Sequence, residues 1–322
     1  MSKHLVYGPS IARGSEKIDV AGLLEAHGPV RPDFMDKTGF RTLYAVPEGV
    51  TALDLAAEAV EGLGDSWWRE SVDGLVYVSS TSTLTAPGDA HLLQARLGLK
   101  KETFVLDLND ACTGFVRALA VVDAIISAGL ASTVLLVAAD TYTKLYDPSE
   151  LKVSPLFSDG ASAFVVSAGG LSGVPEDTVT HEWEILASTF RSEGDHAADL
   201  CITPDASHSS GHLTMNGGAV YTFVLRNLSD VLRNLSERVG ALDYVSWYVH
   251  QGYRMVVTAV EKALSVEQGS LFRSEDYGNV VQSSIPFQLE THTDDREESL
   301  LGFLGFGVGL TIAGAVVRQR RV

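Results

Sequence analysis

The chain has 322 residues, 45% of them hydrophobic, which predicts one large globular unit or two closely packed halves. A formal net charge of −17 argues against nucleic acids and anionic membranes as general partners, and no apolar run is long enough to span a bilayer. Two cysteines make no disulfide framework, and the first residues lack signal-peptide features, so we expect a protein of the reducing cytoplasm.

Two stretches of the chain show a related order of elements. The first predicts strand 72–81, helix 89–99, strand 103–108, helix 111–129 and strands 133–140 and 161–168. The second predicts strand 242–251, helices 254–265 and 279–290, and strands 299–306 and 310–318, after a helix at 221–240. Strands that alternate with helices predict parallel sheets covered by helices. We therefore interpret residues 1–170 and 171–322 as two related halves, joined without a linker.

The segment 111–129 is apolar on nearly all sides, which predicts a helix between two layers that stops at Gly129. Cys112 lies in its first turn, where the helix dipole and unpaired amides favour a thiolate. A strand, a sharp turn, a nucleophile and a helix also form the arrangement that exposes an attacking atom above a sheet. The alternative is that Cys112 is a small buried hydrophobic residue, as free cysteine usually is.

Two residues of the second half favour a catalytic Cys112. His250 ends the strand 242–251, and Asn279 opens the helical segment that corresponds to the Cys112 helix. If the halves pack about a pseudo-twofold axis, the three residues converge. Cysteine, histidine and asparagine occur together in papain-like proteases. The segment "ACTGF" around Cys112 lacks the sequence signature of those enzymes, which argues against a protease.

Seven blocks favour thioester chemistry instead: "DKTGFR" (36–41), "LNDACTGFVRAL" (108–119), "LFSDGASAFVV" (156–166), "LTMNGGAVYTFVLRNL" (213–228), "VHQG" (249–252), "YGNVVQSSIP" (277–286) and "GFGVGLT" (305–311). In these blocks the chain resembles β-ketoacyl-acyl carrier protein synthase III and its relatives of the thiolase superfamily, over nearly its whole length. The resemblance implies an α/β thiolase fold with five layers (αβαβα) and the Cys112 helix in the middle. It also implies a homodimer with strand 103–108 near the contact.

The resemblance implies a decarboxylating condensing enzyme, with thioesters of coenzyme A or acyl carrier protein as substrates and no bound cofactor or metal. Cys112 would carry the acyl group, and the backbone amides of Cys112 and Val308 would form the oxyanion hole. His250 and Asn279 would donate hydrogen bonds to the enolate that malonyl decarboxylation produces. That role requires a neutral histidine whose donor nitrogen faces the substrate.

Four positions depart from the family pattern around the substrate. Tyr253 replaces a polar amide in "HQGY", Lys37 stands where arginine is common, and Phe34 could replace a tryptophan that stacks on adenine. Ala86 stands where a bulkier residue often lines the acyl tunnel. These changes favour specialised metabolism, of polyketides or fatty-acid derivatives, over a housekeeping enzyme primed by acetyl-coenzyme A.

Two other groups of residues have competing interpretations. Arg226, Arg233 and Lys262 could form a docking patch for an acidic carrier protein or an ordinary solvated face. His196, Cys201, His208 and His212 are metal-ligand types, but their spacing matches no zinc motif, so we expect a solvated loop.

Three functions remain open from the sequence: the condensing enzyme, an acyltransferase that passes the acyl group to a hydroxyl, amine or thiol without decarboxylation, and a catalytically silent partner subunit. Retention of Asn279 favours the first, because simple transfer needs a base but no donor to an enolate.

Overall fold

The computed structural model describes residues 3–28, 33–64, 67–176, 178, 180–205, 211–292, 294 and 296–322. Within them nine strands form one sheet, in the order β11 (Val245–Val249), β12 (Glu298–Gly307), β13 (Thr311–Arg321), β8 (Thr180–Ser192), β1 (Lys3–Arg13), β7 (Gly160–Ser167), β6 (Thr133–Asp140), β4 (Gly74–Val78) and β5 (Phe104–Leu108). The predicted division after residue 170 falls in the connection between β7 and β8.

The sheet is mixed, so the prediction of parallel sheets is only partly right. β4 runs parallel to β5 and β6, and β11 runs parallel to β12. β6–β7 and β12–β13 are antiparallel pairs. Only three residues join β12 to β13, which suits an antiparallel pair, whereas a parallel pair needs a long crossover. The second half also has no strand that corresponds to β5 between its helices α7 (Arg254–Leu264) and α8 (Ser284–Thr291).

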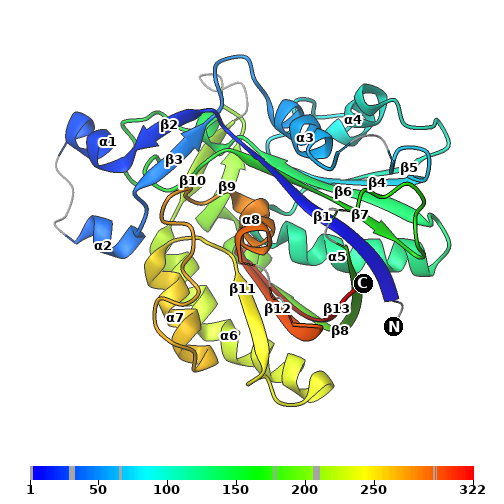
Figure 1. Ribbon diagram of the computed structural model, residues 1–322. Coiled ribbons are helices and arrows are strands. Elements are labelled where there is room, and N and C mark those ends of the chain that lie inside the picture. Colours follow the sequence, from blue (N-terminus) through cyan, green and yellow to red (C-terminus); the bar gives the residue numbers. More distant parts are fainter. Residues whose placement is uncertain are drawn as a thin grey trace.

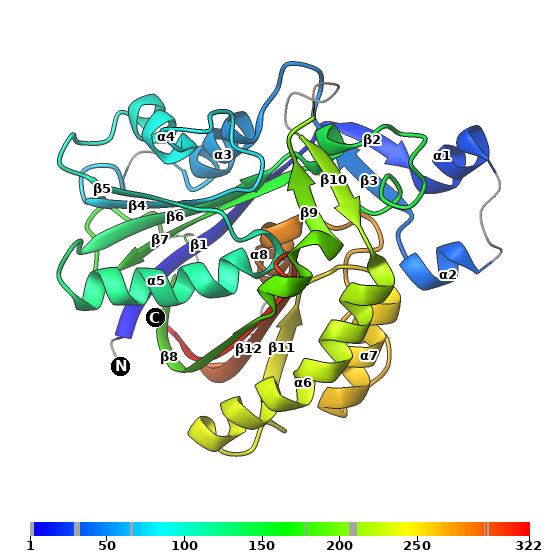
Figure 2. The same cartoon turned by 180° about the vertical axis from the view of Figure 1, so that it is seen from behind.

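Helices divide the molecule into five layers (Figures 1 and 2). α3 (Ala52–Glu61) and α4 (Asp89–Leu97) cover one outer face, and α6 (Gly217–Val239) and α7 cover the other. α5 (Gly114–Ser127) and α8 lie between the two parts of the sheet, in a shared hydrophobic core. The predicted five-layered arrangement is confirmed, with α5 in the middle layer. Its large apolar side chains are buried against both parts of the sheet, apart from the half-buried Val121.

The remaining elements are short excursions from this core: β2 (Glu16–Asp19), α1 (Val20–His27), α2 (Phe34–Thr38), β3 (Thr42–Ala45), β9 (Leu200–Thr203) and β10 (His212–Met215). Two of them, α1 and α2, project at the left of Figure 1, where α2 lies near α7. None of the helices in the described residues combines the length and apolar character required to cross a bilayer.

Candidate active site

Cys112 lies in a sharp turn between β5 and α5. The turn is a short 3-10 helix, Ala111–Thr113, and Ala111 adopts a φ of 39°, a strained value for a residue with a side chain. The prediction that Cys112 occupies the first turn of the α-helix is therefore wrong, because Cys112 lies in the 3-10 helix that precedes α5. A second turn of the same kind, Val281–Ser283, precedes α8, and Val281 has a φ of 50°. The predicted helix start at Asn279 is therefore also too early.

The two turns and the end of β11 place the predicted trio in one pocket. Cys112, His250 and Asn279 are all buried, and all three line one pocket. Tyr253 and Val308 line the same pocket. The structure therefore brings together five of the residues that the sequence singled out, from both halves of the chain.

Glycine is required beside Cys112. Gly307 has a φ of 155°, and a Cβ atom added to it would lie 2.7 Å from Cys112 Sγ. Any side chain there would displace the thiol. The next residue, Val308, lines the pocket, and the backbone N–H groups of Val308 and Cys112 both act to lower the pKa of the thiol. These are the two amides that the sequence nominates for the oxyanion hole.

Burial dominates the ionisation of Cys112. It raises the pKa of the thiol to about 12, more than the hydrogen bond from Val308 lowers it, and the charge of Asp140 adds to the rise. Burial therefore opposes the thiolate that the turn favours, because the loss of solvation outweighs the amides of the turn. The thiol needs a proton acceptor when it attacks.

His250 and Asn279 are both oriented by the backbone of Val281. The Val281 N–H donates to Asn279 Oδ1 at 2.9 Å, which leaves the amide hydrogens of Asn279 as its donors to the pocket. The Val281 carbonyl lies 3.1 Å from His250 Nδ1. Since a carbonyl oxygen only accepts, Nδ1 carries the proton of the neutral ring.

His250 therefore presents a lone pair on Nε2. Burial lowers the pKa of His250 to about 4, so the ring is neutral near pH 7. The expected neutrality agrees with this pKa, but the expected donor nitrogen does not, because the Val281 carbonyl holds the only ring proton. In the resting state His250 is an acceptor.

Two further pocket residues were not predicted from the sequence. Phe306 packs its ring edge-to-face on His250, with 5.3 Å between the ring centres. Tyr142 lines the pocket close to Cys112. Tyr142 follows β6, and the carboxyl end of a parallel strand is where ligand sites gather in α/β folds, so its position was a usable signal.

The four substrate positions lie in different places. Tyr253 lines the catalytic pocket, and its hydroxyl donates to the Gly217 carbonyl at 3.3 Å. Lys37 lines a second, outer groove between α2, α6 and α7, and pairs with Asp33 at 2.6 Å. Phe34 is half-buried against the core, and Ala86 is exposed in the loop after β4. Neither of these two lines the pocket of Cys112.

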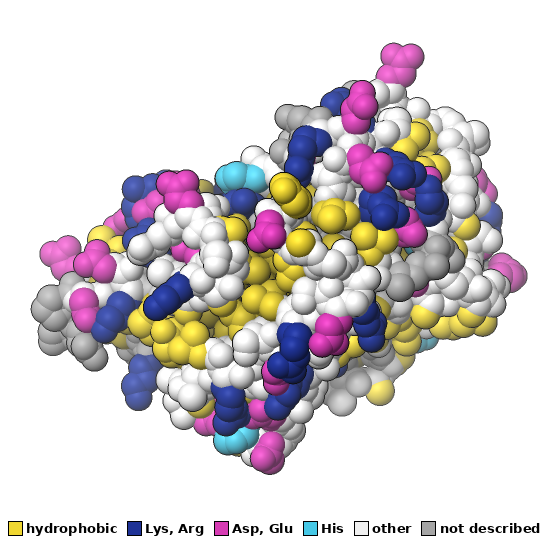
Figure 3. Space-filling view, turned by 90° about the horizontal axis from the view of Figure 1, so that it is seen from below, with side chains coloured by type: hydrophobic (Ala, Val, Ile, Leu, Met, Phe, Trp, Pro, Cys, Tyr) yellow, Lys and Arg dark blue, Asp and Glu magenta, His cyan; other side chains and the backbone are white. Residues whose placement is uncertain are grey.

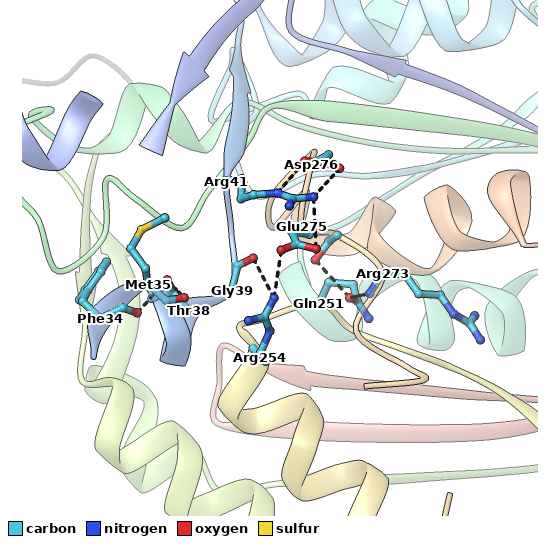
Figure 4. Close-up of polar contacts among 11 residues, drawn as sticks. Phe34, Met35, Thr38, Gly39, Arg41, Gln251, Arg254, Arg273, Glu275 and Asp276 are labelled. Atoms are coloured by element: carbon cyan, nitrogen blue, oxygen red, sulfur yellow. Dashed lines mark hydrogen bonds and ion pairs between the residues drawn. The ribbon is translucent and has the colours of Figure 1, made fainter. Parts of the chain in front are cut away.

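Ion pairs fix the end of the outer groove (Figure 4). Arg254, at the start of α7, contacts the Gly39 carbonyl and Glu275, each at 3.3–3.4 Å. Arg41 contacts Glu275 and Asp276 at 3.3–3.4 Å. These contacts tie the segment after α2 to α7 and to the loop before Asn279. In Figure 3, which shows the side of the molecule where α6 and α7 lie, an apolar hollow is flanked by charged side chains.

The three residues of the predicted docking patch differ in their surroundings. Arg226 pairs with Glu193, and Arg233 pairs with Asp230 at 2.8 Å, so acidic neighbours compensate both cations. Lys262 lines the outer groove with Lys37 and Arg254. A carrier protein would therefore meet a surface of mixed charge on α6, with the cations of the groove beside it.

Within the described residues, His196, Cys201 and His212 belong to no cluster of side chains that could hold a metal ion. His196 contacts Asp199 at 3.1 Å, and His212 contacts Glu150 at 3.5 Å. His208 lies outside the described residues.

Comparison with known proteins identifies the family. The family model for 3-oxoacyl-[acyl-carrier-protein] synthase III matches residues 106–194, and the model for the C-terminal part of that family matches residues 238–319. A β-ketoacyl-[acyl-carrier-protein] synthase III of Cereibacter sphaeroides is 32% identical over 88% of each chain. This chain belongs to the β-ketoacyl-[acyl-carrier-protein] synthase III family. Enzymes of the family are condensing transferases that act on thioesters of coenzyme A or acyl carrier protein.

Other relatives agree in sequence and in fold. The Pseudomonas aeruginosa LESB58 synthase III is 34% identical over 84% of this chain and 82% of its own. The crystal structure of the P. aeruginosa PAO1 synthase III matches with a TM-score of 0.85, 28% identity and 99% coverage of both chains. The synthase III of Thermus thermophilus matches with a TM-score of 0.81 and 27% identity, over 96% of this chain and 97% of its own.

Proposed function

We propose that the protein forms a β-ketoacyl product by decarboxylative condensation through an acyl-Cys112 intermediate. The observation that carries this proposal is the pocket in which the Cys112 thiol, the Val308 amide and the Asn279 amide face one space from both halves of the chain. Family membership supports the class of reaction, and the geometry supports the role of each residue.

In the first step the Cys112 sulfur attacks the carbonyl carbon of an acyl thioester. The thiol proton passes to Nε2 of His250, which presents a lone pair, and then to the sulfur of the leaving thiol. The amides of Cys112 and Val308 stabilise the tetrahedral oxyanion. One thioester is exchanged for another, so acyl-Cys112 and a free thiol result with no net change in protons.

In the second step a malonyl thioester loses carbon dioxide, and its α-carbon attacks acyl-Cys112. Asn279 donates a hydrogen bond to the thioester oxygen that becomes the enolate. The bond between the acyl carbon and Cys112 breaks, and the released thiolate takes up one proton. His250 joins as a donor only when its Nε2 has gained a proton.

The second candidate is acyl transfer without decarboxylation. The lone pair on His250 Nε2 favours it, because that atom can accept the proton of an incoming hydroxyl, amine or thiol. The locked Asn279 amide favours condensation, since general-base transfer gives it no enolate to stabilise. A silent partner subunit would have no use for the complete trio.

We further propose specialised metabolism, a homodimer and a reducing cytoplasm for this enzyme. Tyr253, which lines the pocket together with His250, supports a substrate site unlike that of a housekeeping synthase, whereas the exposed Ala86 lends no support because it does not line the pocket. Every residue of β5, the edge strand, is only half-buried in the single chain, which supports a partner strand against it. Both cysteines are free thiols, which supports the reducing compartment.

Incubation with a panel of acyl thioesters, followed by intact-mass measurement, tests the proposal. We expect one acyl group per chain in the wild type, on Cys112. Acylation at another residue, or none with any coenzyme A or carrier-protein thioester, would contradict it.

A further inference from the structure

The loop between β12 and β13 carries the Val308 amide to the pocket. Its backbone can adopt many conformations, because Val308 lies between Gly307 and Gly309, which have φ values of 155° and 129°. A donor to an oxyanion is most effective when its direction is fixed before the reaction starts, since no rearrangement is then needed. The loop therefore needs a contact that fixes Val308.

Thr311, the first residue of β13, makes such a contact. Its Oγ1 donates to the Val308 carbonyl at 2.6 Å. Thr311 is 5% exposed, so water competes little for this hydrogen bond. It does not line the pocket, so it acts on the reaction only through Val308. Holding the carbonyl of Val308 limits the backbone rotations that would turn its N–H away from Cys112.

The same hydroxyl reaches the turn that contains Cys112. Thr311 Oγ1 lies 3.1 Å from Thr113 Oγ1, and both side chains are buried, although the two residues are 198 positions apart in the chain. The Val308 carbonyl can only accept, so it takes the hydrogen of Thr311, and Thr113 is the donor in the threonine pair. The packing between the two segments is also close, because a Cβ atom added to Gly305 would lie 2.8 Å from the Cys112 carbonyl oxygen.

Thr113 has a second acceptor besides Thr311. Its Oγ1 lies 3.0 Å from Asp110 Oδ2, and Asp110 pairs with Arg117 at 3.0 Å. Because Thr113 Oγ1 carries one hydrogen, it donates to Asp110 or to Thr311, but not to both at once. The hydrogen bond to Val308 is therefore the more persistent of the two contacts that Thr311 makes.

We propose that Thr311 is a positioning residue for the oxyanion hole. Its hydroxyl holds the Val308 N–H toward Cys112, and its contact with Thr113 keeps the Val308 loop aligned with the Cys112 turn. This inference rests on the proposed function, because it needs an oxyanion that forms when Cys112 is acylated. It adds the residue that sets the direction of one of the two donors.

The test compares two reactions of Cys112 in Thr311→Val, each followed by intact mass. Acylation by a thioester that labels the wild type forms an oxyanion, whereas alkylation by iodoacetamide displaces iodide from a methylene carbon and forms none. We expect the ratio of the acylation rate to the alkylation rate to fall about tenfold or more, because the Val308 donor is misplaced. The maximal acylation rate should fall, while the half-saturating concentration of the thioester stays unchanged.

Three other variants sharpen this test. Thr311→Ser keeps the hydroxyl and should keep the wild-type ratio. Thr113→Val removes only the contact between the threonines, so it should lower the ratio less than Thr311→Val does. Thr311→Ala replaces Thr311→Val if the valine variant does not fold.

Thr133→Val is the matched control. Thr133 also forms a buried hydroxyl pair, with Ser167 at 3.0 Å, but it is the first residue of β6 and does not line the pocket, so the ratio should stay at the wild-type value. An unchanged ratio in Thr311→Val, or an equal fall in Thr133→Val, would overturn the inference. Wild-type Cys112 would still be acylated in that case, so the proposed function would stand. Failure of every acyl thioester to label wild-type Cys112 would overturn both.

Discussion

The two halves of the molecule use the same turn for different purposes. In the first half Ala111, with positive φ, precedes Cys112, and α5 starts two residues after that cysteine. In the second half Val281, with positive φ, precedes Gln282, and α8 starts two residues after that glutamine. The two turns contact each other at the centre of the molecule.

The side chains at the matching positions face different surroundings. Cys112 Sγ lies in the pocket under two backbone amides. Gln282 is buried and does not line the pocket, and its Nε2 donates to the carbonyls of Val78 at 2.7 Å and Ala139 at 3.3 Å in the other half. The second turn instead serves the pocket through Val281 and Asn279. One backbone shape therefore places the Cys112 thiol in the pocket in one half and orients two polar side chains in the other.

The largest effect is expected from substitution of Cys112 and Gln282, which occupy matching positions in the two turns. Cys112→Ala should abolish acyl-enzyme formation, because no other described residue brings a thiol to the pocket. Gln282→Ala should keep acylation but lower the free energy of unfolding by about 1–3 kcal/mol, since two buried carbonyls lose a donor. Intact mass and denaturant titration measure the two effects. Acylation of Cys112→Ala at the wild-type rate would show that another residue is the nucleophile.

The two asparagines before the turns offer the next comparison. Asn279→Ala should lower β-ketoacyl product formation by about 10²–10³, because the developing enolate loses a positioned donor. Asn109→Ala is the control, since Asn109 occupies the matching place before the Cys112 turn but is exposed. Product is measured with a saturating malonyl thioester. Equal rates in the two variants would remove Asn279 from the mechanism.

Acid should lower the free energy of unfolding through His250, in the second half of the molecule. The pKa of His250 is about 4 in the folded protein, against an ordinary value of 6.5, so its contribution to stability is present above pH 6.5 and is lost as the pH falls toward 4. Relative to His250→Asn, the wild type should lose about 3 kcal/mol of unfolding free energy between pH 7 and pH 4. The buried carboxyls Asp140 and Asp159, with raised pKa values, cancel in this difference. A difference independent of pH would mean that His250 titrates normally.

The smallest of the expected differences is between alanine substitutions at Gly307, beside Cys112, and at Gly252, beside His250. Gly307→Ala places a methyl group 2.7 Å from Cys112 Sγ, so we expect a loss of about 10² in acylation rate. At Gly252 the nearest atoms, of His250 and Phe306, are 3.6–3.7 Å away, so Gly252→Ala should be tolerated. Stopped-flow acylation measures both. An unchanged acylation rate in Gly307→Ala would show that the Cys112 turn can move to accommodate the methyl group without loss of reactivity.

The sequence was sufficient to predict the strands and helices around the pocket and the convergence of Cys112, His250 and Asn279, because motifs and apolar periodicity are local signals. It missed β1 and β8 of the sheet, and the five layers followed from the family resemblance. It was insufficient for the protonation of Cys112 and His250, since both depend on how completely the fold excludes water from them. The tautomer of His250 depends on the carbonyl of Val281. The direction of that carbonyl follows from the strained φ of Val281, which cannot be predicted from a valine in the sequence. Tyr142 was missed because its place in the pocket depends on where the sheet positions the end of β6.

The most direct test of the central claim starts from purified acyl-Cys112 enzyme and a malonyl thioester labelled in its free carboxyl group. In a single turnover we predict that loss of the acyl mass from Cys112 and release of labelled carbon dioxide occur together, one for one, and that a β-ketoacyl thioester appears in the same amount. Discharge of the acyl group to an acceptor without labelled carbon dioxide would contradict condensation and establish acyl transfer, with His250 as its base.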